Sequence, residues 1–396
     1  MSNIFWIGLL MVFVGGIMAL AGSAISGSDW MLSRMRMGMD RGMDEGMDKK
    51  FVGIFRFILK CQYPLLLSGV ATLFLFCLYL FFSLDAGGFL ELPFPCANLF
   101  SAMPLSLIFP AIVNFANPSP VTFRLDHLSI FFLLIISAIS LLSLVYAQGY
   151  FKMGNYVGKA SSPLSLSPIL SVNLLKKLMS YFFLVGLLLS MVLVVASNHL
   201  LLFILFWEFM SISSLALVLY DYERKSTRKS AFYYFLFTQL GTTLILAALA
   251  LIYWKCGSWD YNVISATTID PESKMLIYIL LLLGVGSKAG IFPLHIWLPY
   301  AHPVAPAHIS ALLSGVMIKV ALYIFLRFYF LLHVQSLTVA YLVLLLGVLS
   351  IFFGAVYSVG QNNFKRLLAY CSVENIGIIW VGFGLFMLGD IEKNYL

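Results

Sequence analysis

Long runs of apolar residues alternate with short polar stretches along most of the chain. A run of about 20 apolar residues is long enough to cross a bilayer as an α-helix, in which the backbone satisfies its own hydrogen bonds. The alternating ten-residue segments typical of a β-barrel are not visible. The pattern therefore predicts an all-α, polytopic transmembrane helix bundle of about ten spans. Their approximate bounds are 4–24, 64–84, 124–146, 180–196, 200–219, 231–254, 274 to the broken stretch near 288, 306–331, 337–359 and 365–388.

Two polar segments separate the first helices. Residues 38–48 repeat Gly-Met-Asp among basic residues, which predicts a flexible or short-helical surface loop. A methionine stripe that binds copper or an amphipathic partner is the alternative. Residues 85–122 contain six prolines, which predicts a loop on the membrane surface. We therefore divide the chain into an N-terminal part, residues 1–122 with helices one and two, and a main membrane domain, residues 123–396.

Composition agrees with this pattern, since 61% of the residues are hydrophobic and 10% are charged, whereas about 25% of residues in soluble domains are charged. The chain is expected to be an integral membrane protein in contact with the lipid bilayer. Residues 4–24 lack a small-residue cleavage site, so we expect a span rather than a signal peptide. The net charge of +7 resides in connecting loops rather than on one face, so no nucleic-acid partner is expected. Lys and Arg concentrate in the loops after odd-numbered helices, which predicts that these loops are cytoplasmic and that the N-terminus is outside.

Cofactor chemistry is not expected in this chain. The five cysteines have no CxxC or Cys/His spacing, so neither an iron–sulfur cluster, a zinc site nor a disulfide framework is predicted. No nucleotide-binding fingerprint is present either. We therefore expect no metal, no cofactor and no catalytic residue here, and any redox chemistry would belong to partner subunits.

Ionisable side chains at bilayer depth are the candidates for function, because a charge in the membrane is costly. They are Glu208, Lys288, Lys319 and Glu374. Glu208 follows the three-residue turn between helices four and five, which places it roughly 12 Å deep. Acids and bases that alternate on different helices are typical of a proton relay. A charge pair about 4 Å apart is worth roughly 4 kcal/mol at an effective dielectric of about 20, so a small movement can load or release a proton. For Glu208, a hydrogen-bonded packing contact is the alternative.

Glycines and prolines around Lys288 predict an interrupted helix. Backbone groups freed by such a break can hold water only where they line a protein cavity. His295, His302 and His308 follow the break and titrate near neutrality, so they are candidate proton carriers. For His302 and His308, hydrogen bonds to the backbone of a proline-rich turn are the alternative.

The acidic residue at the entry to helix three has two interpretations. Asp126, together with His127, is either part of a proton relay or an acid in the first turn of a helix, where it faces the positive end of the dipole. The second arrangement is the more frequent one in helical proteins.

Several motifs together resemble the antiporter-like proton-translocating subunits of respiratory complex I, Mrp antiporters and energy-converting hydrogenases. They are Ser287 to His302, Ala305 to Lys319, Phe206-Trp-Glu208, Phe364 to Tyr370 and Phe123 to Ser129. The resemblance covers about residues 120–390 and implies that Glu208 and Lys288 are a proton-relay pair, with Lys319 as the next carrier. It also includes Lys365 at a helix start. Cys371 to Gly377 is similar to the hydrogenase-4 and formate hydrogenlyase B-type branch.

This resemblance implies a non-redox, proton-pumping subunit of an oxidoreductase complex in the inner membrane, with other membrane and peripheral subunits as partners. Family members usually have about fourteen helices in two inverted repeats, so this chain is expected to contain the first repeat and part of the second. Two alternatives remain open from the sequence: a component of a multisubunit sodium/proton antiporter, and a degenerate subunit that only anchors partners.

Overall fold

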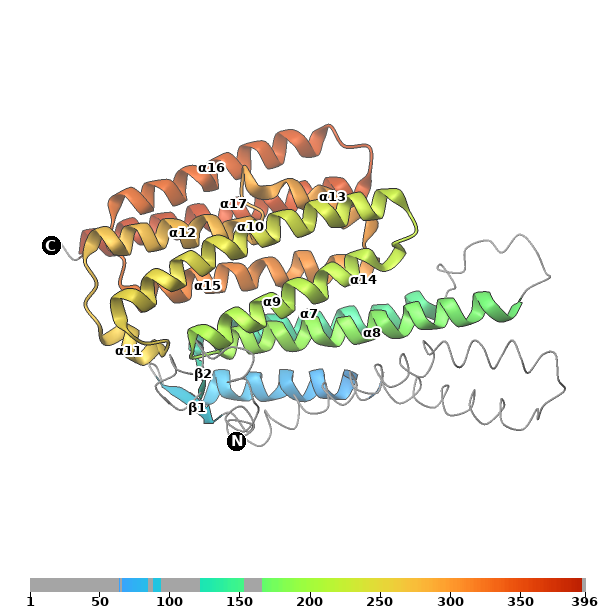
Figure 1. Ribbon diagram of the computed structural model, residues 1–396, viewed down its shortest axis with the longest axis horizontal. Helices are drawn as coiled ribbons and strands as arrows, with labels where there is room; N and C mark the ends of the chain where they lie inside the picture. Colours follow the sequence, from blue (N-terminus) through green and yellow to red (C-terminus); the bar gives the residue numbers. More distant parts are fainter. Residues whose placement is uncertain (1–63, 65, 85–87, 94–121, 153–165, 394–396) are drawn as a thin grey trace.

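The computed structural model of the protein describes residues 64, 66–84, 88–93, 122–152 and 166–393. The expected helix at 4–24, the Gly-Met-Asp segment and most of the proline-rich stretch lie outside these residues. Within them, nine helical segments are long and apolar enough to span a membrane. The helices lie roughly side by side along the length of the molecule (Figure 1). The all-α, polytopic class predicted from the sequence is confirmed.

The helical elements follow one another along the chain (Figure 1). The first described span, Leu66–Ser83, carries no label and is blue in Figure 1. The others are α7 (His127–Lys152), α8 (Leu166–Ala196), α9 (Leu200–Val218), α10 (Lys225–Cys256), α11 (Tyr261–Ala266), α12 (Pro271–Ala289), α13 (Leu298–Val304), α14 (Ala307–Leu312), α15 (Ile318–Leu332), α16 (Leu337–Val359) and α17 (Phe364–Lys393). Three short helical turns, η1 (Leu219–Asp221), η2 (Leu294–Trp297) and η3 (Leu313–Met317), lie between them.

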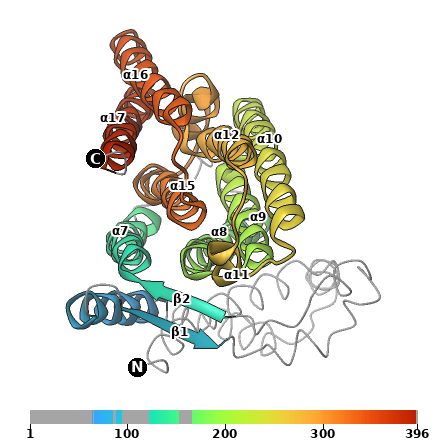
Figure 2. The same ribbon diagram turned by 90° about the vertical axis from the view of Figure 1, so that its left-hand side faces the viewer.

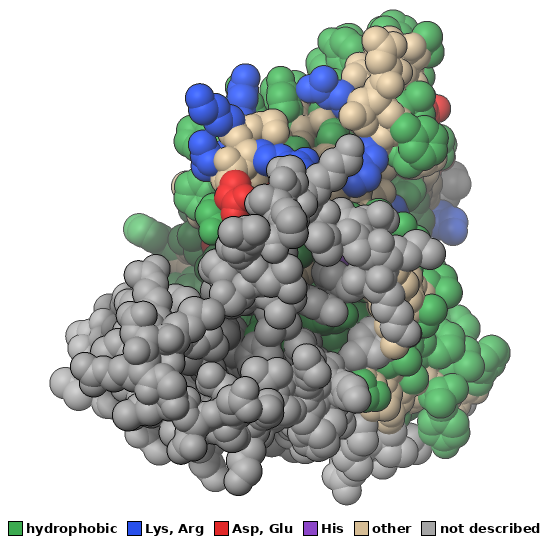
Figure 3. Space-filling view, turned by 90° about the vertical axis from the view of Figure 1, so that its right-hand side faces the viewer, with side chains coloured by type: hydrophobic (Ala, Val, Ile, Leu, Met, Phe, Trp, Pro, Cys, Tyr) green, Lys and Arg blue, Asp and Glu red, His purple; other side chains and the backbone are tan. Residues whose placement is uncertain are grey.

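The two ends of the bundle differ. We call the end that contains Lys225, Val304 and Phe364 the basic end, and the end that contains β1 (Phe89–Pro93), β2 (Thr122–Asp126) and α11 the hairpin end (Figure 1). Strands β1 and β2 pair antiparallel, with Glu91 opposite Arg124. Figure 3 shows the basic end, where Lys and Arg side chains gather beside hydrophobic ones.

Helix α15 lies near the middle of the bundle, with α7, α8, α12 and α17 around it when viewed along the helices (Figure 2). Its aromatic side chains make these contacts. Phe325 lies 4.4 Å from the Trp380 ring of α17, between ring centroids, and its carbonyl oxygen accepts a 3.1 Å hydrogen bond from the Tyr278 hydroxyl of α12. Phe328 packs on Phe203 of α9 at 5.8 Å between ring centroids. The apolar core is therefore built around α15.

Helices α8 and α9 form the antiparallel hairpin that the three-residue turn predicted. His199 caps α9, because its Nδ1 accepts a 3.3 Å hydrogen bond from the Leu201 backbone N–H. Burial lowers the pKa of His199, while the nearby Asp260 carboxylate acts in the opposite direction. A lowered pKa keeps the imidazole neutral, so that one ring nitrogen can accept this bond.

Glycines allow α10 and α12 to approach closely. A Cβ atom on Gly284 would lie 2.7 Å from the Gly241 carbonyl oxygen, and a Cβ atom on Gly241 would lie 2.7 Å from the Gly284 carbonyl oxygen. Small residues at such crossings are typical of membrane helices, where close packing replaces the hydrophobic driving force. This contact fixes the half of α12 that carries Lys288.

Local structure differs from the expected helix bounds at two places, and one short helix was not anticipated. Thr122–Asp126 is a strand paired with Phe89–Pro93, so α7 begins at His127 rather than at residue 124. The basic stretch expected as a loop up to Ser230 is helical from Lys225, because α10 continues past the apolar part of its sequence. The polar stretch before α12 contains α11, whose N-terminus is capped by Asp260 through a 2.7 Å bond to the Asn262 backbone N–H.

Candidate functional site

The predicted relay pair lies on α9 and α12. Lys288 is 2% exposed, and its Nζ donates a 2.6 Å hydrogen bond to Ser211 Oγ on α9. The same ammonium lies 4.4 Å from the centroid of the Trp207 ring. A cation over an indole face gains electrostatic stabilisation, most of all where water is excluded. The buried lysine is therefore held by a hydroxyl and an aromatic ring.

Glu208 has a different partner. Its Oε2 accepts a 3.2 Å hydrogen bond from Gln239 Nε2 on α10, and its buried Oε1 has no hydrogen-bond partner among the described residues. Glu208 lies between Trp207 and Ser211 in the sequence of α9, so it is within one helical turn of both groups that contact Lys288. The two charges are neighbours, yet Glu208 and Lys288 are not within ion-pair distance among the residues that the structure describes.

The helix break after Lys288 is confirmed. Helix α12 ends at Ala289, and Gly290 adopts a left-handed conformation with φ of 75°. The freed backbone groups are bound by side chains: Trp297 Nε1 donates 2.8 Å to the Ser287 carbonyl oxygen, and the Phe292 N–H donates 2.9 Å to Ser350 Oγ. Water in a cavity was expected to satisfy such groups, but these two are satisfied by side chains instead. The break is instead a fixed turn that ends beside Lys288.

Lys319 lies at the start of α15, directly after the π-helical turn η3. Its Nζ donates a 2.7 Å hydrogen bond to the carbonyl oxygen of Ser314 within that turn. The Ser314 hydroxyl lies 2.9 Å from the Ser372 hydroxyl of α17. A π-turn widens the helix and frees carbonyl groups, and such turns are frequent at functional sites. Here the turn supplies the carbonyl oxygen that accepts the hydrogen bond of Lys319.

Two of the three predicted histidines lie with Lys365 around the turn from α13 to α14. His302 Nδ1 is 2.7 Å from Ser310 Oγ, and its buried Nε2 has no partner among the described residues. The His308 ring packs edge-on against Tyr150, 5.5 Å between centroids. Lys365 Nζ donates a 2.8 Å hydrogen bond to the Ala305 carbonyl oxygen of that turn. These groups form a polar cluster between Lys319 and the basic end of the bundle.

The remaining predicted residues lie apart from that cluster. The His295 ring stacks on Phe292, 5.5 Å between centroids, and faces Tyr370 at 6.1 Å. Glu374 is half-buried on α17, where its backbone N–H would lie 2.7 Å from a Cβ atom on Gly354 of α16. Within the described part of the chain, the Glu374 carboxylate makes no hydrogen bond or ion pair with the other predicted residues. The structure therefore does not bring Glu374 into the group around Lys288.

Sequence reasoning missed the immediate partners of the relay pair. Ser211 follows Glu208 by three residues, so it shares a helix face, and Trp207 precedes Glu208 directly. A helical projection of α9 would have placed both residues beside Glu208. Gln239 was not, because its contact depends on how α10 is rotated against α9. These three side chains decide where the two charges rest.

A second charged network lies at the hairpin end. Arg327 of α15 binds both carboxylate oxygens of Asp126, with Nη2 2.8 Å from Oδ1 and Nη1 2.5 Å from Oδ2. Its Nη2 also donates 2.7 Å to Ser129 Oγ, and the Tyr323 hydroxyl donates 2.6 Å to the Val195 carbonyl oxygen of α8. Asp126 caps α7 as well, through a 2.9 Å bond from the Ser129 N–H. This confirms the helix-start interpretation of Asp126.

The Asp126 carboxyl remains ionised in this network. Burial alone would raise its pKa, but the hydrogen bonds and the positive charge of Arg327 outweigh burial and lower the pKa to about 2. A carboxylate with such a pKa does not take up protons near neutrality. Asp126 therefore acts as a structural anchor and not as a proton carrier.

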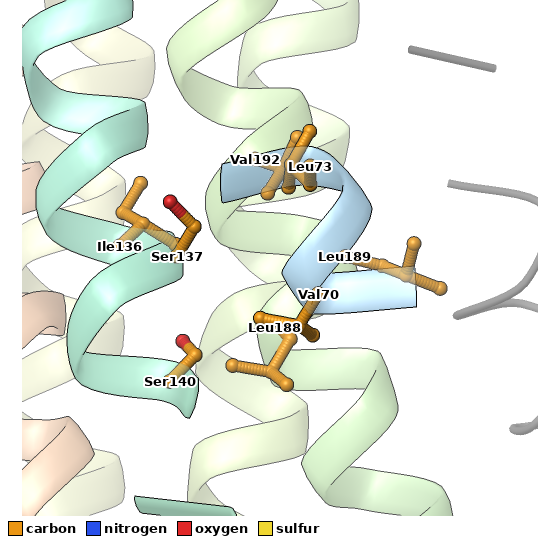
Figure 4. A pocket seen from close by; sticks show the side chains of 8 residues that line it. All are labelled: Val70, Leu73, Ile136, Ser137, Ser140, Leu188, Leu189 and Val192. Carbon is orange, nitrogen blue, oxygen red and sulfur yellow. The ribbon is translucent and has the colours of Figure 1, made fainter. Parts of the chain in front are cut away.

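A small cavity lies away from these charges, between the helix Leu66–Ser83, α7 and α8 (Figure 4). Its volume is about 10 Å³, and Ser137 and Ser140 of α7 face the aliphatic side chains that line the rest of it. The Ser137 hydroxyl is used in a 2.7 Å bond to the Leu133 carbonyl oxygen. One water needs about this much space. The cavity is too small for an organic ligand.

No group of three or more His, Cys, Asp or Glu in the described residues is arranged to hold a metal ion. Around Lys288 the structure places an ammonium, the Glu208 carboxylate and the Ser211 hydroxyl, which are groups that can exchange protons. Such groups pass protons when they approach hydrogen-bond distance of each other, directly or through one water.

The family described as NADH:quinone oxidoreductase/Mrp antiporter, transmembrane, matches residues 197–392. The family described as the N-terminus of NADH-ubiquinone oxidoreductase (complex I) chain 5 matches residues 113–156. Together these matches include the predicted relay pair, Lys319, the histidines and Asp126.

One curated relative is hydrogenase-4 component B of Escherichia coli, which is 33% identical over 284 residues that cover 70% of this chain and 39% of the relative. The chain thus spans well under half of that relative's length. Two solved structures are similar in fold. One is from the Mrp complex of Dietzia sp., with a TM-score of 0.66, 17% identity and coverage of 97% of this chain and 59% of the other. The second is from an archaeal membrane-bound sulfane sulfur reductase, with a TM-score of 0.62, 18% identity and coverage of 94% and 64%.

Proposed function

The chain belongs to the antiporter-like family of NADH:quinone oxidoreductase and Mrp antiporter membrane subunits, and on this premise we propose that it moves protons within a larger membrane complex. In this proposal it is a non-redox subunit of a hydrogenase-like or NADH:quinone oxidoreductase-like complex. Partner subunits, both membrane-embedded and peripheral, carry out the redox chemistry. The similarity to hydrogenase-4 component B supports the hydrogenase branch.

The observation that carries the proposal is the separate anchoring of two neighbouring charges, the buried Lys288 ammonium and the half-buried Glu208 carboxylate. Lys288 rests on Ser211, and Glu208 rests on Gln239. Two opposite charges about 4 Å apart attract each other by roughly 4 kcal/mol at an effective dielectric of about 20. A change of partner, from Ser211 to the Glu208 carboxylate, therefore changes how strongly Lys288 holds its proton. This two-position arrangement is what a relay driven by conformational change requires.

The onward path uses the other predicted residues. Lys319 is the next carrier on α15, and the cluster of His302, His308 and Lys365 connects it to the basic end. His295 and Glu374 are assigned lesser roles on neighbouring helices, as proton carriers outside this cluster. We place the basic end on the cytoplasmic side of the inner membrane and the N-terminus outside, because Lys and Arg are retained on the cytoplasmic side.

The test is proton uptake by membrane vesicles that carry the assembled complex. Glu208→Gln and Lys288→Met are compared with Glu272→Gln and Lys274→Met, which make the same chemical changes near the surface end of α12. Loss of uptake in the first two variants alone, with assembly intact, supports the relay. Equal uptake in all four would overturn it and would favour the scaffold alternative, in which the chain only anchors partners.

A sodium/proton antiporter component is the second candidate, favoured by the match to the NADH:quinone oxidoreductase/Mrp antiporter family. The same vesicles distinguish the two. Proton flux that requires a sodium gradient and persists without a redox substrate would favour the antiporter. Flux that starts only when an electron donor and acceptor are added would favour the redox-driven pump.

A further inference from the structure

A cluster of two cations and two stacked tyrosines lies at the basic end, where three helices meet. The Arg366 guanidinium of α17 lies 5.1 Å from the centroid of the Tyr300 ring of α13. Tyr300 stacks on Tyr233 of α10, with 4.8 Å between centroids and 30° between planes. The Lys229 ammonium lies 6.0 Å from the centroid of the Tyr233 ring. We call these four residues the Arg–Tyr cluster.

The cations of this cluster lack acidic partners, unlike other basic residues nearby. Lys176 pairs with Glu223 at 2.7 Å, and Arg224 lies 3.8 Å from Asp221. Among the ion pairs of the described residues, none includes Lys229 or Arg366. The ring faces hold the two cations in place but do not neutralise them, because an aromatic face carries only a partial negative charge. The positive charge is therefore available for an anion.

The position of the cluster indicates what kind of anion. The candidate spans that carry it begin at Lys225 and Phe364 and end at Val304, so the cluster lies at the boundary of the membrane. Exposed apolar side chains lie near the cations on both helices. On α10, Phe232 and Phe235 follow Lys229 by three and six residues, toward the bilayer core, and are 60% and 47% exposed. On α17, Phe364 lies at the helix start and Leu368 two residues beyond Arg366, and they are 72% and 47% exposed.

We propose that the Arg–Tyr cluster binds the phosphate of an anionic phospholipid, with the acyl chains along the exposed apolar side chains of α10 and α17. The guanidinium and ammonium groups form charge-assisted hydrogen bonds with phosphate oxygens. Since the rings already hold both cations, little side-chain entropy is lost on binding. A soluble phosphate would bind the cations but would not contact the exposed apolar side chains of α10 and α17. Cations beside exposed apolar side chains therefore favour a lipid.

The experiment measures lipid binding to the purified full chain in detergent by native mass spectrometry. Phosphatidylglycerol is titrated against phosphatidylcholine with the same acyl chains. The wild type is expected to bind phosphatidylglycerol more tightly, and Lys229→Gln with Arg366→Gln to weaken that binding about 25-fold, at about fivefold for each lost charge near the surface. The control, Arg224→Gln with Lys225→Gln, removes the same charge from the same end and is expected to retain wild-type affinity.

Three results would overturn the proposal. Equal binding of the two lipids, or an equal loss in the control pair, would mean that only the general charge of this end matters. Complete displacement of phosphatidylglycerol by millimolar glycerol 3-phosphate would indicate a site for soluble phosphate instead. If the double variant does not fold, Lys229→Gln alone decides, because Lys229 is exposed and its loss is expected to weaken binding about fivefold.

Discussion

Breaking the Asp126–Arg327 pair is expected to destabilise the hairpin end by a measurable coupling energy. The pair joins the start of α7 to α15, and through Ser129 and Tyr323 it reaches α8. We consider Asp126→Asn, Arg327→Gln and the double variant as a thermodynamic cycle. Such a cycle isolates the interaction between the two side chains from their separate contributions.

The magnitude follows from the ionisation of Asp126. Its pKa is lowered from 3.8 to about 2, with burial acting against the shift and the bonds and charge of Arg327 producing it. At about 1.4 kcal/mol for each pH unit, this corresponds to about 2 kcal/mol of stability at neutral pH. The side chains of Arg327 and Asp126 are 13% and 18% exposed, so solvent screens the pair only in part. Each single variant leaves one buried charge without its partner and is expected to lose at least as much.

The pH dependence has a defined sign. Because the pKa of Asp126 is lower in the folded protein than in the unfolded chain, the contribution is complete above about pH 4. It is lost as the pH falls toward about 2, where the folded carboxyl becomes protonated. The coupling energy is therefore expected to vanish between pH 4 and pH 2.

The assay is reversible unfolding in mixed micelles with increasing SDS, followed by tryptophan fluorescence. The matched control is the Lys255–Asp270 pair at the same end, which has a 2.7 Å contact but side chains that are 38% and 49% exposed. An exposed pair of this kind is expected to give no resolvable coupling. The reasoning is refuted if both pairs give the same coupling energy, or if that of Asp126 and Arg327 persists unchanged at pH 2.

Two further predictions concern the helices that hold the relay. Gly284→Ala is expected to lower stability by about 1–3 kcal/mol in the same SDS assay, because its Cβ would lie 2.7 Å from a carbonyl oxygen of α10. Gly382→Ala, where a Cβ would meet nothing within 4 Å, is expected to be neutral or stabilising, and an equal loss in both would contradict the close-contact argument. Ser211→Ala is expected to slow proton uptake about tenfold, since a hydrogen bond to a charged group contributes roughly 1.5 kcal/mol or more. Ser213→Ala, equally buried on α9 but without a hydrogen bond from its hydroxyl among the described residues, should leave uptake unchanged, so equal rates in both variants would remove Ser211 from the relay.

The helices and the break were accessible from the sequence because hydropathy and backbone chemistry act locally. Runs of apolar residues define spans whatever their neighbours are, and Gly290 marks the end of α12 because glycine adopts positive φ without strain. The pairing of β1 with β2 was not accessible. These strands are short and lie far apart in the sequence, so the five-residue alternation of polar and apolar residues in β2 gave no indication of its partner.

The candidate site was accessible only as a set of costly charges. Burial cost identified Glu208, Lys288 and Lys319, since few other positions in the apolar runs are ionisable. Their partners depend on how the helices are rotated against one another. Gln239 is an ordinary polar residue in sequence, and only the packing of α10 on α9 places it beside Glu208. Arg327 was overlooked because its distance from Asp126 along the chain gives no sign that the two residues meet.

The π-helical turn η3 sets the direction in which the whole of α15 faces. One residue advances a helix by about 100°, since a turn contains 3.6 residues. The extra residue accommodated between Leu313 and Met317 therefore rotates everything that follows it relative to α14. Lys319 near the start of α15 and Arg327 near its end share this rotation, although they take part in different networks. A deletion of one residue in this turn would redirect both side chains together, so the length of this segment constrains the protein more tightly than the identity of its individual residues.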